Sequence, residues 1–219
     1  MSEEGTTLLE QPPLHTIETD RLQLKTITMD DLSNIMDIIT DKRVMQWTSQ
    51  GPVSNQQQGE RWLSARALGS GVINFAIRER AENHVNDKII GIVGSFHPPA
   101  CGYMIHTDYA GKGYATEALK AFVQFYFQQH PAASEGCTGF DHIEGLVDAQ
   151  NYASQRILEK CGFTKVAYRE QAFNSPLMGL RDDMIFRRPR PGKTLEQLGL
   201  DATAEARPAG DEPPEPPVQ

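Results

Sequence analysis

The 219-residue chain contains no apolar run near the roughly 18 residues that a membrane-spanning helix needs. Cysteine is scarce: Cys101, Cys137 and Cys161 form no CxxC pair, and one would be left over in any disulfide pairing. We therefore expect reduced thiols, as in intracellular proteins, and neither a disulfide framework nor a zinc site. The six histidines show no HxxxH spacing, so we expect no metal centre.

An excess of positive charge is also absent. The net charge is −8, but residues 1–10 contribute −3 and residues 197–219 contribute −4, which leaves −1 for the chain between them. This nearly neutral core offers no basic face, and we expect no nucleic-acid or membrane partner. The acidic, polar N-terminus does not resemble a signal or transit peptide, so the expected location is the cytoplasm, with the nucleus as the alternative.

The composition indicates three regions. With 39% hydrophobic residues, the chain can form one well-packed core, and we assign residues 14–191 to a single domain. Residues 192–219 are rich in proline, alanine and acidic residues, and we predict that they are disordered. Residues 1–13 are predicted to be disordered as well.

Hydrophobic periodicity between these ends predicts an alternating pattern of strands and helices. The expected strands cover residues 21–27, 73–80, 88–97, 101–106, 142–149, 165–171 and 182–188, and a polar loop at 81–87 joins two of them. The expected helices cover residues 29–41, 55–68, 114–129 and 151–163. The third helix places Leu119, Phe122 and Tyr126 on one face, and Pro131 ends it.

The segment "HTDYAGKGYATEAL" places two glycines and a lysine directly before a helix. A Walker A loop is excluded, because glycine follows Lys112 and no glycine begins the motif. The dinucleotide fingerprint GxGxxG fits poorly, since Thr116 occupies its last position and no acidic residue closes a second strand at the right distance. The third hypothesis is a coenzyme A diphosphate loop, in which Gly111 and Gly113 leave backbone N–H groups open at a helix N-terminus.

Two motifs carry a resemblance to a known family. "DYAGKGYATEAL" followed by "NYASQRILEKCGF" resembles the GCN5-related N-acetyltransferase (GNAT) superfamily, specifically its RimJ/RimL-like branch, which acetylates ribosomal proteins. The opening "IETDRLQLKTITMDDL" and the later "LRDDMIF" resemble the same branch, so the likeness covers about residues 16–188. It implies an α/β (α+β) GNAT fold: a mixed, mostly antiparallel, twisted sheet of about six to seven strands with helices on both faces.

The resemblance implies a binding site for acetyl-CoA. The family's loop pattern falls on Ala110, Gly111, Lys112, Gly113, Tyr114 and Ala115. Ala110 departs from that pattern, which removes side-chain support but leaves the backbone contacts to the diphosphate. The strand "GYMIH" is expected to diverge from its neighbour and pair with the pantetheine arm, and a backbone N–H near Met104 or Ile105 is the implied oxyanion donor.

The leaving thiolate needs a partner, which many relatives supply as a tyrosine one turn along the last helix. This chain has Leu158 at that position. The resemblance makes Ser154, three residues after Asn151 at the start of that helix, the candidate partner of the thiolate. It places both residues in the catalytic and acetyl-CoA-binding site. Asn151 and Ser154 can alternatively serve as helix-capping residues, and both roles can hold at once.

The general base is less well defined. Glu144 lies on a strand that should border the cleft, and the branch often has an acid there. The alternative is that Glu144 is a solvated strand residue with no chemical role. Asp148 and His97 are further candidates, and a water chain to bulk solvent would also serve.

Together these features predict an N-acetyltransferase that uses acetyl-CoA as co-substrate and no metal. A primary amine, either a protein N-terminus or a small molecule, would attack the thioester directly in a ternary complex, without an acyl-enzyme. The alternative is a non-catalytic acyl-CoA-binding regulatory or interaction module, and a nucleotide-dependent oxidoreductase is the third hypothesis. We expect a monomer or a homodimer.

Overall fold

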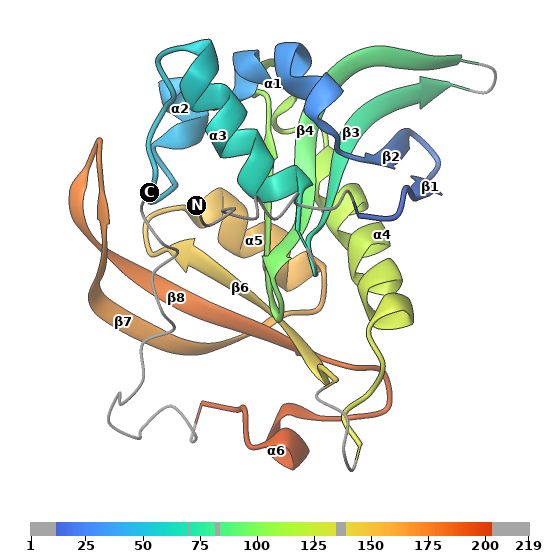
Figure 1. Ribbon diagram of the computed structural model, residues 1–219. Helices are drawn as coiled ribbons and strands as arrows, with labels where there is room; N and C mark the ends of the chain where they lie inside the picture. The colour runs from blue at the N-terminus through green and yellow to red at the C-terminus, as the bar shows by residue number, and fades with distance from the viewer. Residues whose placement is uncertain (1–11, 70, 82–83, 135–138, 203–219) are drawn as a thin grey trace, which may run out of the picture.

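The computed structural model of the protein describes residues 12–69, 71–81, 84–134 and 139–202. The predictions made for residues 1–11 and 203–219 lie outside these described residues, as does Cys137. The described chain forms one eight-stranded sheet with helices on both faces (Figure 1). The expected α/β fold is therefore confirmed, with a slightly higher strand count than the sequence predicts.

The strands follow the order β1-β2-β3-β4-β5-β6-β8-β7 across the sheet. All neighbouring strands are antiparallel except β5 and β6, which are parallel. The three-residue β1 is the strand that the sequence does not predict, because so short a segment shows no periodicity. The strands are β1 (Thr16–Glu18), β2 (Leu22–Thr26), β3 (Ile73–Ala81), β4 (His84–His97), β5 (Ala100–Ile105), β6 (His142–Asp148), β7 (Thr164–Ser175) and β8 (Gly179–Pro189).

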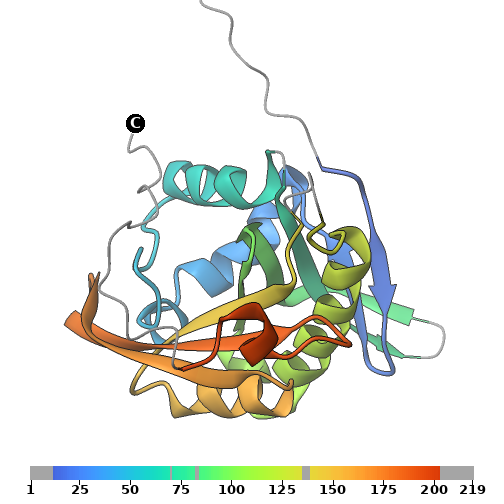
Figure 2. The same ribbon diagram turned by 90° about the horizontal axis from the view of Figure 1, so that it is seen from below.

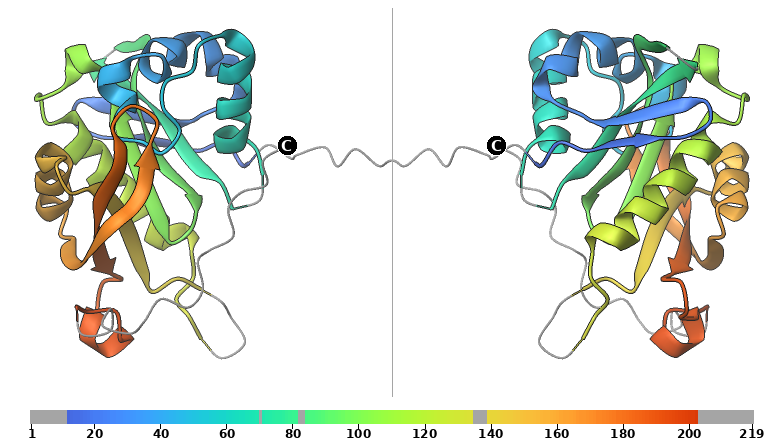
Figure 3. Two further views of the ribbon diagram at one scale, coloured as in Figure 1. Left: turned by 90° about the vertical axis from the view of Figure 1, so that its left-hand side faces the viewer. Right: turned by 90° about the vertical axis from the view of Figure 1, so that its right-hand side faces the viewer.

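The longer helices form two layers around the sheet (Figure 3). Helices α4 (Tyr114–Gln129) and α5 (Tyr152–Lys160) cover one face, and α1 (Leu32–Ile39) and α3 (Gln56–Ala67) cover the other. Side chains of β3 alternate between the two layers, as the two-residue period of a strand requires: Phe75 packs toward α4, and Ala76 packs toward α1 and α3. The short elements are η1 (Met29–Asp31), α2 (Lys42–Met45), η2 (Thr107–Tyr109) and α6 (Leu195–Leu198).

The loop predicted at residues 81–87 is mostly strand. Strand β3 continues to Ala81 and β4 begins at His84, and these two residues are partners in the ladder. The prediction failed because the ladder bonds are made by backbone groups, so polar residues can extend a hairpin beyond the apolar core.

The chain also stays folded beyond residue 191, so the predicted start of the disordered tail is wrong for residues 192–202. A capping box begins helix α6, and Leu195 within it is 7% exposed and packs near Val166 and Ile185. Figure 2 shows α6 lying against β7 and β8. The prediction failed because it used the average composition of residues 192–219, which is proline-rich and acidic although the segment around Leu195 is apolar.

A chain ending at Pro191 is expected to be less stable than one ending at Ala202. The shorter chain loses the buried side chain of Leu195 and the 3.2 Å hydrogen bond from Arg187 Nη1 to the Leu200 carbonyl. Burial of one leucine contributes about 2 kcal/mol, so the melting temperature should fall by about 4–8 °C. Thermal unfolding followed by circular dichroism measures the difference, and equal melting temperatures would show that α6 adds nothing to the fold.

Candidate active site

The sheet opens between its two parallel strands. Strands β5 and β6 pair at only two positions, Ala100 with Glu144 and Cys101 with Gly145. Beyond these positions the strands diverge, although β5 remains paired with β4 as far as Ile105. The expected divergence of this strand is therefore confirmed, and residues 102–105 have one free edge.

The alternation of an antiparallel ladder decides which backbone groups point to that free edge. The N–H of His106 donates to the Ile90 carbonyl at 2.8 Å, so residues 104 and 102 also direct their N–H and C=O groups toward β4. Tyr103 and Ile105 consequently direct theirs toward the gap. Of the two candidate oxyanion donors, Ile105 has its N–H at the open edge, whereas the N–H of Met104 faces β4.

The glycine loop enters helix α4 in the conformation that the motif predicts. Gly111 and Gly113 have φ angles of 76° and 84°, which strain any other residue, and Gly113 directly precedes the first turn. A Cβ atom at Gly111 would meet nothing within 4 Å, so the space above the loop is open. The first N–H groups of a helix have no partner within it, and those of Tyr114 and Ala115 are therefore available to an anion.

The side chains of the loop are held by neighbouring groups. Lys112 Nζ lies over the Tyr109 ring, 4.7 Å from its centroid. The hydroxyl of Tyr114 donates to Glu79 of β3. Ala110 has extended backbone at the end of η2 and offers only a methyl group to the loop. The loop thus presents backbone amides and one lysine.

Arg21 and Glu117 brace this loop, and no local sequence pattern identifies either of them. Arg21 Nη1 donates to the Lys112 carbonyl at 3.1 Å, and its Nη2 lies 2.6 Å from the Glu117 carboxylate. Glu117, in the first turn of α4, also accepts from Thr19 Oγ1 at 2.6 Å. Burial acts to raise the pKa of Glu117, but these hydrogen bonds outweigh it and lower the pKa, so the carboxylate stays ionised.

The start of α5 separates the two roles considered for Asn151 and Ser154. The side chain of Asn151 accepts from the Ser154 N–H at 3.1 Å, so the capping role of Asn151 is confirmed. The Ser154 hydroxyl does not cap the helix; its Oγ lies 2.7 Å from the hydroxyl of Tyr103 on β5. Leu158 is 2% exposed and packs onto Gly145, where an added Cβ would lie 2.9 Å from its Cδ2.

The candidate bases are engaged by arginines or lie outside the gap. Glu144 stands where β5 and β6 are still paired, and its carboxylate accepts from Arg187 Nε at 2.7 Å. Its side chain is 17% exposed, so the alternative of a solvated strand residue is wrong. Asp148 is fully buried and accepts two hydrogen bonds from Arg181, which lower its pKa although burial alone would raise it. His97 is exposed at the end of β4.

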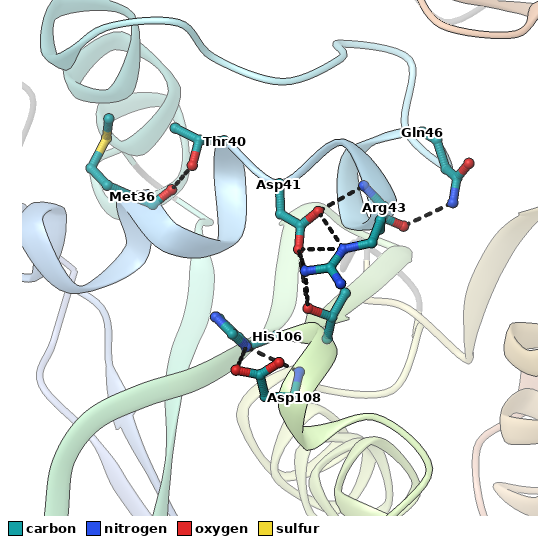
Figure 4. A network of polar contacts seen from close by, with 8 residues as sticks. Met36, Thr40, Asp41, Arg43, Gln46, His106 and Asp108 are labelled. Carbon is teal, nitrogen blue, oxygen red and sulfur yellow. Dashed lines mark hydrogen bonds and ion pairs between the residues drawn. The ribbon is translucent and has the colours of Figure 1, made fainter.

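A polar network ties α2 to the residues that follow β5 (Figure 4). Asp41 caps α2 by accepting from the Arg43 N–H at 2.8 Å, and its other oxygen accepts from Thr107 Oγ1 at 3.1 Å. Arg43 Nη2 also donates to Thr107 Oγ1 at 2.8 Å. His106, the residue before Thr107, accepts at its Nδ1 from the Asp108 N–H at 3.2 Å. The open strand β5 and helix α2 are therefore fixed relative to each other.

This network predicts an acid-dependent loss of stability. Hydrogen bonds from Arg43 lower the pKa of Asp41 from 3.8 to about 2. Because the pKa in the unfolded chain is higher, near 3.9, ionised Asp41 stabilises the fold above about pH 4, and this stabilisation is lost as the pH falls toward about 2. Urea midpoints measured at several pH values should fall less steeply in Asp41→Asn than in the wild type over that range. Parallel curves would contradict the prediction.

The β7–β8 hairpin reaches the helical side of the opening. Ser175 Oγ donates to the Gln46 carbonyl at 3.2 Å, and Pro176 packs against Gly51, where an added Cβ would lie 3.1 Å away. Figure 3 shows the hairpin tip beside the segment that joins α2 to α3. These contacts join the two halves of the sheet at the end where β5 and β6 diverge.

The two described cysteines are not activated nucleophiles. Burial raises the pKa of the Cys101 thiol far above its ordinary value and that of Cys161 to about 11.

Within the described residues, no three His, Cys, Asp or Glu side chains are grouped so that they could hold a metal ion. No helix in the described part of the chain is long and apolar enough to cross a membrane.

A sheet that opens between two parallel strands, beside a glycine loop at a helix N-terminus, is the arrangement of an acetyltransferase. The model of the acetyltransferase (GNAT) domain family matches residues 21–164, and the chain belongs to that family. The predicted family and enzyme class are thereby confirmed.

Known proteins of similar sequence or fold agree with this assignment. The uncharacterized N-acetyltransferase YoaA of Bacillus subtilis (strain 168) is 27% identical over 158 residues, which cover 68% of this chain and 82% of YoaA. A GNAT-family acetyltransferase from Bacillus anthracis has a similar fold, with a TM-score of 0.64, 18% identity, and coverage of 80% of this chain and 98% of its own. RimL, the ribosomal L7/L12 α-N-protein acetyltransferase solved with coenzyme A, has a TM-score of 0.64 at 15% identity and coverage of 82% and 100%.

Proposed function

We propose that the protein transfers the acetyl group of acetyl-CoA to a primary amine, in a ternary complex. The observation that carries this proposal is the free edge of β5 leading to the glycine loop. An extended pantetheine arm carries amide groups that match the free N–H and C=O groups of Tyr103 and Ile105. The open N–H groups of the loop and of the first turn of α4 suit the diphosphate of the same molecule.

The proposed reaction uses the groups that surround this opening. A neutral amine attacks the thioester carbonyl, and the Ile105 N–H donates to the oxygen as negative charge develops on it. When the C–S bond breaks, its electron pair stays on sulfur, and the Ser154 hydroxyl donates a hydrogen bond to the thiolate. The raised pKa values of Cys101 and Cys161 favour this direct route over an acyl-enzyme.

Both carboxylates near the gap are held by arginines, so we propose that water accepts the proton of the attacking amine. Glu144 is paired with Arg187, and Asp148 with Arg181. In both pairs the carboxylate already accepts hydrogen bonds from its arginine, and these bonds would have to break before it could take the proton of an amine. Accordingly, Glu144→Gln should leave the pH dependence of turnover unchanged, which a role as general base would not allow.

The acceptor is proposed to be a protein N-terminus or a small-molecule amine. RimL, which shares the fold, acetylates the α-amino group of a ribosomal protein, and this supports the first class. The nearly neutral core of the chain does not favour a highly charged acceptor.

Release of coenzyme A thiol from acetyl-CoA, measured with a thiol reagent, tests the proposal. The acceptors are short peptides beginning with serine, alanine or methionine, the same peptides with blocked N-termini, and small amines such as spermidine. Release with free but not blocked amines is expected. Binding of acetyl-CoA without release for any amine would favour the non-catalytic module instead, and a thermal shift with NADPH but not acetyl-CoA would contradict both.

A further inference from the structure

We propose that Tyr103 is a positioning residue that holds the Ser154 hydroxyl in the orientation needed to stabilise the leaving thiolate. This inference rests on the proposed function. Tyr103 is on a strand, so it is a different residue from the helix tyrosine that many relatives use. Tyr103 comes from the diverging half of β5, whereas Ser154 lies in the first turn of α5. Their contact therefore joins the two walls of the opening.

The distances define a three-atom arrangement. The Tyr103 oxygen lies 2.7 Å from Ser154 Oγ and 3.1 Å from the Ser154 carbonyl oxygen. Each hydroxyl has one proton, so two patterns are possible. In the first, Tyr103 donates to the carbonyl and Ser154 donates to Tyr103. In the second, Tyr103 donates to Ser154 Oγ, and the Ser154 O–H is free to donate a hydrogen bond to another acceptor.

A thiolate selects the second pattern. When the C–S bond breaks, sulfur carries the electron pair, and the Ser154 O–H turns toward it while Tyr103 donates to Ser154 Oγ. No proton leaves either hydroxyl in this step. The amine gives its proton to water, and the thiolate later takes one from water. Burial raises the pKa of Tyr103, so its phenol stays protonated and can donate throughout the working range of pH.

The packing of Leu158 explains why the tyrosine hydroxyl near the opening comes from strand β5 in this chain and not from helix α5. Leu158 points into the core against Gly145 and is 2% exposed, so its position on α5 offers no hydroxyl to the opening. Tyr103 is the hydrogen-bond partner of Ser154 Oγ among the described residues, at 2.7 Å. Without it, no neighbouring side chain in the described part of the chain fixes the orientation of the Ser154 hydroxyl toward the sulfur.

The test is a double-mutant cycle with Tyr103→Phe, Ser154→Ala and the double variant. If Tyr103 acts through Ser154, each single variant should lower kcat by about tenfold with the KM for acetyl-CoA unchanged. The double variant should then lose no more than Ser154→Ala alone. Tyr126→Phe is the matched control, because it removes one phenol oxygen from a fully buried tyrosine with no hydrogen-bond partner among the described residues. Its kcat should equal that of the wild type.

Three results would overturn the inference. An unchanged kcat in Tyr103→Phe would show that the hydroxyl has no role in turnover. Losses that multiply in the double variant would show that Tyr103 acts independently of Ser154. If Tyr103→Phe lowers the melting temperature and raises the KM for acetyl-CoA along with the loss in kcat, Tyr103 is a structural residue. If the wild type binds acetyl-CoA but acetylates no amine, the proposed function fails and this inference fails with it. If the wild type is active and Tyr103→Phe is equally active, only this inference fails.

Discussion

Replacing Gly113 with valine is expected to weaken acetyl-CoA binding by about tenfold or more. Gly113 has a φ of 84°, where a residue with a side chain costs about 1–2 kcal/mol, and relief of that strain moves the amides that we propose bind the diphosphate. The valine side chain also enters the space beside the loop, where a Cβ atom already lies 3.4 Å from Arg21 Nη2. Acetyl-CoA at about 100 times the wild-type dissociation constant stabilises the wild type by about 2.7 kcal/mol. The same concentration should stabilise the variant by about 1.4 kcal/mol or less.

Gly192→Val is the matched control for the backbone strain. Gly192 has a φ of 87°, and a Cβ atom there would meet nothing within 4 Å. Its substitution should therefore lower the melting temperature of the free protein by a similar amount, while the thermal shift with acetyl-CoA stays at the wild-type value. A Gly113→Val variant that binds acetyl-CoA as tightly as the wild type would remove the glycine loop from the proposed site.

The largest loss of stability is expected from Arg190→Ala, at about 3 kcal/mol. The guanidinium donates to the carbonyls of Phe127, His130 and Phe140 at 2.8, 2.5 and 3.0 Å, and its side chain is 15% exposed. Phe127 belongs to the last turn of α4, whose carbonyls have no partner within the helix. Arg190 thus caps α4 and joins it to the chain before β6 and after β8. The melting temperature should fall by about 6–12 °C.

Arg43→Ala provides the comparison, because it removes an arginine of the same size whose side chain is 70% exposed and paired with Asp41. An exposed ion pair of this kind is screened by solvent and contributes little to stability. Urea unfolding of the two variants at pH 7 separates the cases. Equal losses would show that the three carbonyl bonds of Arg190 are replaced by water in the variant.

The sequence predicts the parts of the site that depend on neighbouring residues. Gly111 and Gly113 were identified because a left-handed backbone before a helix has a local signature. Asn151 was identified as a cap for the same reason. The general order of strands and helices also follows from periodicity, with the short β1, α2 and α6 missed.

The bracing residues depend on contacts between distant segments. Thr19 and Glu117 are 98 positions apart, and Tyr103 and Ser154 are 51 apart, so no spacing rule pairs them. The alternation that gives Ile105 rather than Met104 a free N–H is set by the pairing of β5 with β4, which the sequence does not specify. The engagement of Glu144 by Arg187 likewise requires the antiparallel register of β6 and β8.

The short parallel pairing of β5 and β6 has a consequence for how the protein exchanges hydrogen with solvent. In the described part of the sheet, two ladder pairs between β5 and β6 provide the backbone pairing between the five strands on one side and the three on the other. In the free protein, the amides of Tyr103 and Ile105 lack a ladder partner and should exchange quickly, while those of Met104 and His106, bonded to β4, should be protected. An extended ligand in the gap would act as an additional strand, and new protection of the Tyr103 and Ile105 amides of β5 would record its position.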